Sequence, residues 1–179
     1  LYGKTAIPEL NSATYDNVEV GWRALLASGI RLDSALYQLS GKDTIVSYTS
    51  DIGNSFNKNA GNTRSRGLEL SLKQDLRGWG GEWDWRVGAT WAEHTFVSYR
   101  VSDKVGAIED YSGKDMPQAP NHTITAQVGW KFTPTSRVAL GLVKQGSYWM
   151  NNANTVRYAG HTLLNLTASH KLGDGWEVW

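Results

Sequence analysis

The sequence predicts an all-β fold, an antiparallel up-and-down meander of about eight strands, and three observations predict it. Apolar and polar residues alternate with period two along most of the chain, which is the pattern of strands with two different faces. The connections between these segments alternate between short and long. The chain holds 9 Trp and 8 Tyr against 3 Phe, and side chains with an apolar body and a polar tip suit a boundary between oil and water.

Composition limits the remaining choices. The 179 residues suffice for one domain, and a net charge of +1 gives no argument for nucleic acid as a partner. The absence of cysteine excludes disulfides and thiolate metal sites. No run approaches the ~18 apolar residues of a spanning helix. The chain opens on Leu1-Tyr2-Gly3 without methionine or a signal peptide, so we expect a mature form or a piece of a larger protein.

The first half of the chain predicts four strands. Residues 1–14 carry no period and are expected to form a loop. The expected strands cover about 17–26, 30–39, 67–74 and 83–92. The second of them changes phase, because Leu32 and Leu36 share one face whereas Ala35 and Tyr37 share the other. We expect a β-bulge near Ser34 to restore the alternation.

The second half predicts three further strands and the start of an eighth, over about 123–132, 137–142, 164–172 and 176–179. Short connections are expected at 27–29, 77–81, 133–136 and 173–175, and long ones at 41–63, 98–120 and 146–160. The first long connection could carry a strand extension over 45–48. In a meander, alternate connections lie at opposite ends of the sheet, so one end is trimmed and the other is elaborated.

This asymmetry is typical of outer-membrane barrels, which have short periplasmic turns and longer extracellular loops. Aromatic residues support it, because they lie on the apolar face beside the short turns and form one interfacial girdle; these are Trp83, Trp130, Phe132 and Trp176. A second girdle is expected at the other end from Tyr99, Tyr148 and Trp149. The polar face is rich in small and charged residues and suits a lumen. The pattern favours a transmembrane barrel, and a soluble β-sandwich stays open as the alternative.

No catalytic constellation, cofactor site or metal site is predicted. The four histidines, His94, His122, His161 and His170, lack ligand spacing, and Met116 and Met150 are isolated. We therefore do not expect an enzyme.

Five segments resemble the TonB-dependent outer-membrane receptors. The most specific is Asn59-Ala60-Gly61 followed by Thr63-Arg64-Ser65-Arg66-Gly67-Leu68-Glu69-Leu70. The others are Pro8-Glu9-Leu10 with Tyr15-Asp16-Asn17-Val18-Glu19-Val20-Gly21-Trp22-Arg23, then 30–45, Met116-Pro117-Gln118-Ala119-Pro120-Asn121-His122, and Leu163-Leu164-Asn165-Leu166. Asn11-Ser12-Ala13 departs from the family's usual Lys-Pro-Glu and affects a loop.

The resemblance implies a bacterial outer-membrane protein with an N-terminal plug inside a barrel of ~22 strands. Residues 1–179 would then be a partial barrel domain from the C-terminal half, without the plug, the TonB box and the final strands. It also implies uptake of a ferric siderophore with energy passed from TonB through the plug. Other ligands (cobalamin, haem or a metal complex), a passive porin-like barrel and a soluble β-binding module remain alternatives.

Arg, Lys, Tyr and Trp side chains hold anionic, aromatic-rich iron chelates through charge, hydrogen bonds and stacking. The ligand-binding candidates lie in the three long connections: Tyr48, Phe56, Asn57 and Lys58; Tyr99, Arg100, Tyr111 and Lys114; Tyr148, Trp149, Met150 and Arg157. Arg64, Arg66 and Glu69 are candidates to face the lumen and the plug. Each of these residues could instead be a solvated loop residue, a girdle aromatic or a paired wall charge.

Overall fold

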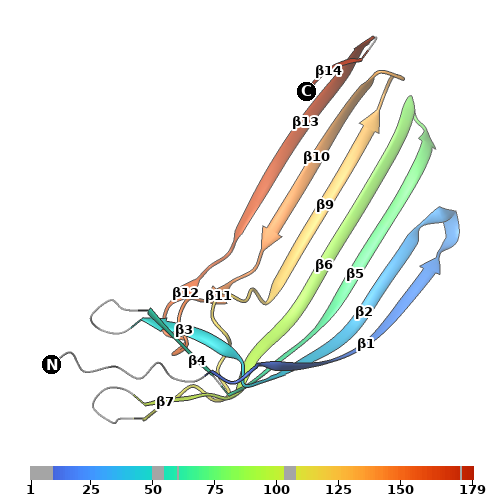
Figure 1. Cartoon of the computed structure of the whole chain (residues 1–179). Helices are drawn as coiled ribbons and strands as arrows, with labels where there is room; N and C mark the ends of the chain where they lie inside the picture. The colour runs from blue at the N-terminus through green and yellow to red at the C-terminus, as the bar shows by residue number, and fades with distance from the viewer. Residues whose placement is uncertain (1–9, 50–54, 60, 103–107, 174) are drawn as a thin grey trace.

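The computed structural model describes the chain except residues 1–9, 50–54, 60, 103–107 and 174. Eight strands form one antiparallel sheet in the order β1-β2-β5-β6-β9-β10-β13-β14, so neighbours in the sheet follow one another along the chain. They are β1 (Thr14–Leu25), β2 (Arg31–Lys42), β5 (Asn62–Gly78), β6 (Gly81–Ser98), β9 (His122–Lys131), β10 (Ser136–Gln145), β13 (His161–Gly173) and β14 (Trp176–Val178). In Figure 1 they lie side by side from blue β1 to red β14.

The predicted meander of about eight antiparallel strands is confirmed. The sheet is a single layer, and the remaining sheets among the described residues are two-stranded hairpins. A β-sandwich buries one face of each sheet against a second sheet of similar size. The described residues hold no such second sheet, which leaves both faces of the main sheet without a packing layer.

The long connections carry the three hairpins, which gather at one end of the sheet (Figure 1). They pair β3 (Ile45–Thr49) with β4 (Ser55–Asn59), β7 (Arg100–Ser102) with β8 (Ile108–Asp110), and β11 (Tyr148–Trp149) with β12 (Arg157–Tyr158). The strand extension expected over 45–48 is therefore present as β3. The sequence did not predict the other five short strands, because their segments are too short to display a period.

The opposite end of the sheet is trimmed to tight turns. β1 and β2 are joined by the single 3-10 turn η1 (Ala27–Gly29). β5 and β6 are joined by Trp79 and Gly80, whose φ angles of 49° and 75° are both positive. Two central residues with positive φ are characteristic of a type I′ turn, whose twist matches that of the flanking strands. In the part of the chain that the structure describes, no helix reaches the length and apolarity needed for a membrane crossing.

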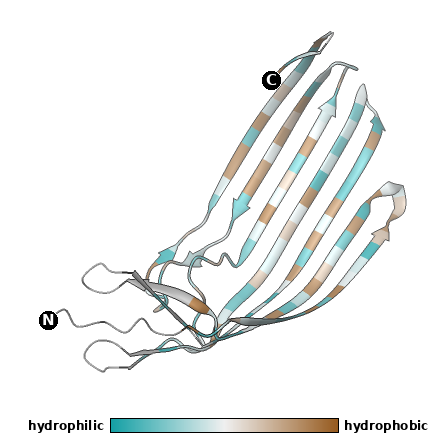
Figure 2. Ribbon diagram, in the orientation of Figure 1, coloured by the Kyte–Doolittle hydropathy of each residue, from teal (hydrophilic) through white to brown (hydrophobic). Residues whose placement is uncertain are grey.

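The strand register joins the apolar residues of all strands into one continuous face, here called the leucine face. Directly opposed residues of antiparallel strands lie on the same face of a sheet. The row Leu36–Leu68–Trp91 shows this, since Leu68 is opposite both of the others. The face comprises Val18, Val20, Trp22, Leu32, Leu70, Leu72, Leu76, Trp83, Val87, Ile124, Ala126, Val128, Trp130, Val138, Leu140, Leu142, Leu164 and Leu166, with the row above. The opposite side is called the polar face, and Figure 2 shows the resulting alternation along the strands.

The bulge expected near Ser34 is wrong. β2 pairs with β1 and with β5 from Arg31 to Gly41 without a shift of register. Ala35 and Tyr37 therefore lie on the polar face in spite of their apolar character. Tyr37 is accommodated because it lies over Gly67, where a Cβ atom would stand 2.8 Å from the tyrosine hydroxyl.

Many side chains of the leucine face are open to the surroundings. Leu164 and Leu166 are 69% and 74% exposed, and Val18 is 68% exposed. Burial of such a side chain is worth ~1.5–3 kcal/mol, so a broad exposed apolar face requires an apolar environment or a partner.

Aromatic residues form the last row of the leucine face beside the tight turns. The ring centroids of Trp83 and Trp130 are 5.1 Å apart and nearly parallel, and Phe132 lies 5.2 Å from Trp130. The same row reaches Leu76 and Val138 through the register. These aromatic residues therefore gather beside the tight turns, as the sequence predicted for the first girdle.

The second predicted girdle does not include Tyr99. Tyr99 is 2% exposed and packs against Phe96, which is 1% exposed, with Tyr111 and Met116 around them. The expectation that Tyr99 is an interfacial residue is therefore wrong. The residue instead belongs to the small core that anchors the second long connection to β6.

Candidate functional site

A hollow of about 780 Å³ lies on the polar face and crosses five strands from β1 to β9. Charged and hydroxyl side chains line it, among them Glu19, Glu69 and Thr90. Arg23 and Asp33 also line it and form an ion pair of 3.0 Å. A hollow that spans five strands on this side gives the sheet a wet, concave face, which suits the lumen of a barrel.

Ion pairs continue along the polar face toward the tight turns. Arg137 donates from Nη2 to both carboxylate oxygens of Asp84 at 2.8 and 2.6 Å. It reaches across Gly129, where a Cβ atom would stand 1.9 Å from the guanidinium. Lys131 lies 3.3 Å from Glu82. These charges are paired within the wall, so they fix neighbouring strands in register on the wet side.

The second and third long connections are joined to each other above the sheet. Asn154 accepts a hydrogen bond from the backbone N–H of Asp115 and donates to its carbonyl, both at 2.9 Å. Lys114 donates from Nζ to the Ala153 carbonyl at 2.8 Å. Because Asn154 satisfies both backbone groups of Asp115, it acts as a staple between segments 39 residues apart.

The stapled connections present aromatic and cationic groups. The Tyr111 ring lies 5.4 Å from the Tyr99 ring, and Lys114 Nζ lies 5.9 Å from the Tyr111 ring centroid. Burial, followed by the hydrogen bond that Tyr111 donates to Glu109, raises the pKa of the Tyr111 hydroxyl to about 12. Tyr111 is therefore a neutral hydrogen-bond donor at physiological pH.

The β7–β8 hairpin carries a charge pair beside this group. Arg100 donates from Nε to Asp110 at 2.9 Å, and the Ser112 N–H donates to the other carboxylate oxygen at 2.9 Å. Hydrogen bonds from Ser112, together with Arg100, lower the pKa of Asp110 to about 2. Arg100 is thus committed to a partner.

The third connection divides its side chains between the two sides of the sheet. The Tyr148 ring packs against the Tyr158 ring at a tilt, with ring centroids 4.9 Å apart, and the Tyr158 hydroxyl lies 2.9 Å from His161 Nδ1. His161 is opposite Gln145, which is opposite Thr123 on the polar face. Alternation along β11 sends the next residue, Trp149, to the other side.

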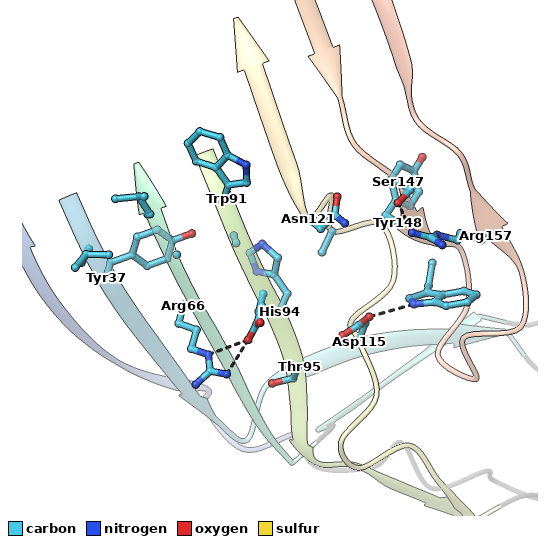
Figure 3. Close-up of a pocket in the computed structure, with 17 residues that line it drawn as sticks. Tyr37, Arg66, Trp91, His94, Thr95, Asp115, Asn121, Ser147, Tyr148 and Arg157 are labelled. Atoms are coloured by element: carbon cyan, nitrogen blue, oxygen red, sulfur yellow. Dashed lines mark hydrogen bonds and ion pairs between the residues drawn. The ribbon is translucent and has the colours of Figure 1, made fainter. Parts of the chain in front are cut away.

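A second hollow, of about 940 Å³ and here called the belt-edge hollow, is lined by residues of both faces, among them Trp149 from one side and Tyr37 and Tyr148 from the other. Its lining includes Arg66, Trp91, Glu93, Asp115, Trp149 and Arg157 (Figure 3). Arg66 donates to one oxygen of Glu93 from Nε at 2.9 Å and from Nη2 at 2.8 Å.

Arg64 and Arg66 were candidates to face the lumen, with a paired wall charge as the alternative, and the register now gives their side of the sheet. Arg64 is opposite Thr95 and Arg66 is opposite Glu93, two and one rows beyond the Leu68–Trp91 pair. Both arginines have the same parity as Leu68, so they lie on the leucine face. Glu69 has the other parity and lines the polar-face hollow.

The remaining predicted ligand-binding residues are distributed as follows. Met150 is 52% exposed in the third connection, and Asn57 is exposed in β4. The side chains of Tyr48, Phe56 and Lys58 lie outside the described residues, although their backbones belong to β3 and β4. Tyr99 is buried, and Trp149 and Arg157 line the belt-edge hollow.

Sequence reasoning missed Asp115 and Asn154, which join the second and third long connections. Both lie in polar loop segments, and their pairing across 39 residues leaves no trace in a local pattern. Within the described ranges, no group of three or more His, Asp or Glu side chains could hold a metal ion.

Comparisons with known proteins agree with this architecture. The family model "TonB dependent receptor-like, beta-barrel" matches residues 1–179. Three solved structures resemble the chain. The siderophore receptor PiuA from Acinetobacter baumannii matches 89% of this chain with a TM-score of 0.69 and 20% identity, and the ferric yersiniabactin uptake receptor FyuA from Yersinia pestis matches 88% with a TM-score of 0.65 and 21% identity. The ferric-catecholate import receptor Fiu from Escherichia coli K12 matches 90% with a TM-score of 0.62 and 17% identity. In each case the chain covers 22% of the other protein.

Proposed function

The chain belongs to the TonB-dependent receptor β-barrel family, and from this premise we propose that it forms part of the wall and mouth of an outer-membrane receptor that imports a ferric siderophore. The family is one of bacterial outer-membrane receptors. The observation that carries the proposal is one sheet with a broad apolar face, a wet face that bears a hollow, and aromatic and cationic loops joined at one end.

The dimensions of the leucine face support a membrane position. Along β5 it extends from Leu68 to Leu76, eight residue steps, which is about 27 Å at ~3.4 Å per residue. At the ~40° tilt of barrel strands, this projects to about 21 Å. The apolar band of outer-membrane barrels is ~25 Å tall, so the height of this face is close to that of the band.

The mouth supports an anionic, aromatic ligand. Lys114 offers a charge next to the Tyr111 ring, and Tyr148 lies on the polar side of β11. Stacking and charge-assisted hydrogen bonds of this kind suit ferric chelates of catecholate or related type. The descriptions of the three structural neighbours as siderophore or ferric-chelate receptors support the same ligand class.

The whole receptor is larger than this chain in the proposal. A sheet with two open edges exposes unpaired backbone groups, and each such group in lipid costs several kcal/mol. We infer that further strands close β1 and β14 into a barrel of ~22 strands around a plug that contacts TonB. The ion pairs and Glu69 on the polar face are then the wall that the plug faces.

The test is uptake of a radioactive iron chelate by cells that carry or lack this receptor. We expect ⁵⁵Fe uptake from one siderophore class to require the receptor and to stop with an uncoupler of the proton-motive force. A panel of catecholate, hydroxamate and mixed-ligand chelates identifies the class. Receptor-dependent growth on haem or cobalamin, with no chelate taken up, would contradict the siderophore assignment. Uptake that continues with the uncoupler would indicate a passive barrel.

A further inference from the structure

We propose that Arg31, Lys73 and Arg86 form an anion site on the polar face, which an anionic ferric chelate occupies on its way from the mouth to the periplasm. The inference rests on the proposed function, which makes the polar face the inner wall of a barrel that imports such a chelate. It adds a second point of contact, away from the loops, at which the charge of the chelate affects its transport.

The three cations, here called the cation row, lie side by side on three neighbouring strands. Lys73 of β5 is directly opposite Arg31 of β2 and directly opposite Arg86 of β6. The Cβ atoms of directly opposed residues lie about 5 Å apart, and like charges in such positions destabilise a sheet. Since natural proteins depart from such rules mainly at functional sites, the cation row indicates a function that depends on positive charge.

The central and outer cations of the row are available to a ligand. Among the described residues, the Lys73 side chain has no partner in an ion pair or hydrogen bond. Asp84 lies 2.6 Å from Arg137 but 3.8 Å from Arg86, so its charge is already taken up by Arg137. The Arg86 side chain is 65% exposed, and Lys73 is exposed as well. A ligand can therefore reach both cations from the open side of the polar face.

The surroundings of the cation row carry an excess of positive charge. Asp75 pairs with Arg31. From β2 to β10, the polar-face rows between the cation row and the tight turns hold, with the cation row itself, six cations and three carboxylates: Arg31, Lys73, Arg77, Arg86, Lys131 and Arg137, against Asp75, Glu82 and Asp84. The ion pairs of this region thus leave positive charge uncompensated.

The polar-face hollow leads to the cation row. The adjacent row on the mouth side lines the hollow and consists of Asp33, Ser71, Gly88 and Thr125. Ser71 and Gly88 precede Lys73 and Arg86 on the mouth side of the same strands. Because one of these residues is small and the other has no side chain, the hollow stays open toward the two cations.

The carboxylates along the hollow do not neutralise the cation row. Asp33 pairs with Arg23 at 3.0 Å. Glu69 lies four residues from Lys73 along β5, which is about 14 Å at ~3.4 Å per residue, and exposed charges more than ~8 Å apart are largely screened at physiological ionic strength. Glu19 is opposite Tyr37, one row further toward the mouth than Glu69. The end of the hollow beside the tight turns is therefore its positive end.

A small anion with several charges fits the cation row better than a single carboxylate does. Neighbouring strands lie ~4.8 Å apart, so the three cations span about 10 Å across the sheet. One carboxylate of a plug meets only part of this span, whereas a chelate with several anionic oxygens can meet all three cations. Rings of Arg and Lys select anions in other pores, and a wall of low dielectric constant concentrates counter-ions. The cation row therefore favours anionic over neutral chelates.

The experiment measures transport by cells that carry the full-length receptor, with two ⁵⁵Fe probes. One probe is a ferric tris-catecholate, which is an anion, and the other is a neutral ferric tris-hydroxamate. We expect the double variant Lys73→Gln with Arg86→Gln to lower the maximal rate of tris-catecholate uptake about 10-fold. Its affinity for the same chelate at the surface of uncoupled cells should stay unchanged, which also shows that the variant is folded. Lys73→Arg keeps the charge and should keep the wild-type rate.

Lys171→Gln is the matched control. Lys171 is on the polar face of β13, opposite Glu177, and β13 is the fourth strand along the sheet from β5. An unchanged uptake rate in the double variant, or an equal loss in the control, would overturn the proposal. A loss of uptake that is explained by weaker binding at the cell surface would overturn it too, because the cations would then act in the mouth.

Other outcomes separate this inference from the proposed function. A receptor that imports only neutral chelates such as the tris-hydroxamate refutes the anion site and leaves the import of a ferric siderophore in place. A receptor that imports no ferric chelate refutes the proposed function itself. If the double variant makes cells sensitive to a large hydrophilic antibiotic, the cation row holds a plug in place, and the assignment to a chelate is wrong.

Discussion

A charge introduced on the leucine face should destabilise the protein according to its depth in the membrane. Leu72 lies at the middle of the apolar stretch of β5, opposite Leu32 and Val87. An arginine on the lipid side of a barrel costs ~2–4 kcal/mol at the midplane and ~0–1 kcal/mol near the interface. Leu72→Arg should therefore lower the folding equilibrium constant about 30- to 700-fold. Leu68→Arg, in the last apolar row, should lower it less than about 5-fold.

Ser71→Arg is the matched control, because Ser71 is the sequence neighbour of Leu72 and lines the polar-face hollow. An arginine there keeps its contact with water, so the folding equilibrium should change less than about 3-fold. The assay is reversible unfolding by guanidinium in phospholipid bilayers, read by the fluorescence of the 9 tryptophans.

Bilayer thickness separates a lipid-facing surface from a buried protein core. In longer-chain lipids the apolar layer extends further, so Leu68→Arg should become more costly while Ser71→Arg stays unchanged. A soluble core would give equal costs at Leu68 and Leu72 in every lipid. That outcome, or a cost at Ser71 as large as at Leu72, would refute the assignment of the two faces.

Three further predictions concern single contacts. Gln74 is a buried polar residue on the leucine face, and it accepts a hydrogen bond from Trp85 Nε1 at 2.9 Å. Gln74→Ala should therefore lower the free energy of unfolding by ~1–3 kcal/mol in the same assay. An unchanged unfolding midpoint would contradict this. The carboxyl group of Asp110 should titrate with a midpoint of about 2. Its contribution to the stability of the β7–β8 hairpin is therefore complete above the ordinary pKa of 3.8 and is lost as the pH falls through about 2. A midpoint near 3.8 in the carboxyl ¹³C shift would be inconsistent with the contact. Asn154→Ala should release the third long connection from the second and raise the rate at which a protease cuts the third connection several-fold. Met150→Ala, which changes an exposed side chain of the same connection, should leave this rate unchanged. Equal cleavage rates in the two variants would show that the Asn154 staple is dispensable.

The strands and their faces could be predicted from the sequence because they depend on local alternation. Trp83 and Leu70 mark the leucine face by parity alone, and the register then joins them to their neighbours. The same parity already placed Arg64 and Arg66 with Leu68. The prediction left both a lumenal position and a paired wall charge open, and Arg66 is paired with Glu93 across β5 and β6.

The phase change in β2 shows where composition misleads. Ala35 and Tyr37 suggested a bulge because apolar residues were assumed to need the leucine face. Instead, the register is unbroken, and Tyr37 finds a place over Gly67 on the polar face. A residue with a polar tip and an apolar body can lie on either side, so its identity does not fix the phase.

By itself, the sequence determined the eight-stranded meander, the trimmed and elaborated ends, and the two faces of the strands outside β2 and the start of β5, because each depends on the period of a short stretch of chain. Only the tertiary structure decided that Tyr99 is core, that Asn154 joins two connections, and that Asp115 meets Trp149. These contacts join loop residues that lie 12 to 39 residues apart along the chain. Loops lack a repeating backbone geometry, so the partners of their side chains are set by where the folded sheet brings the segments together.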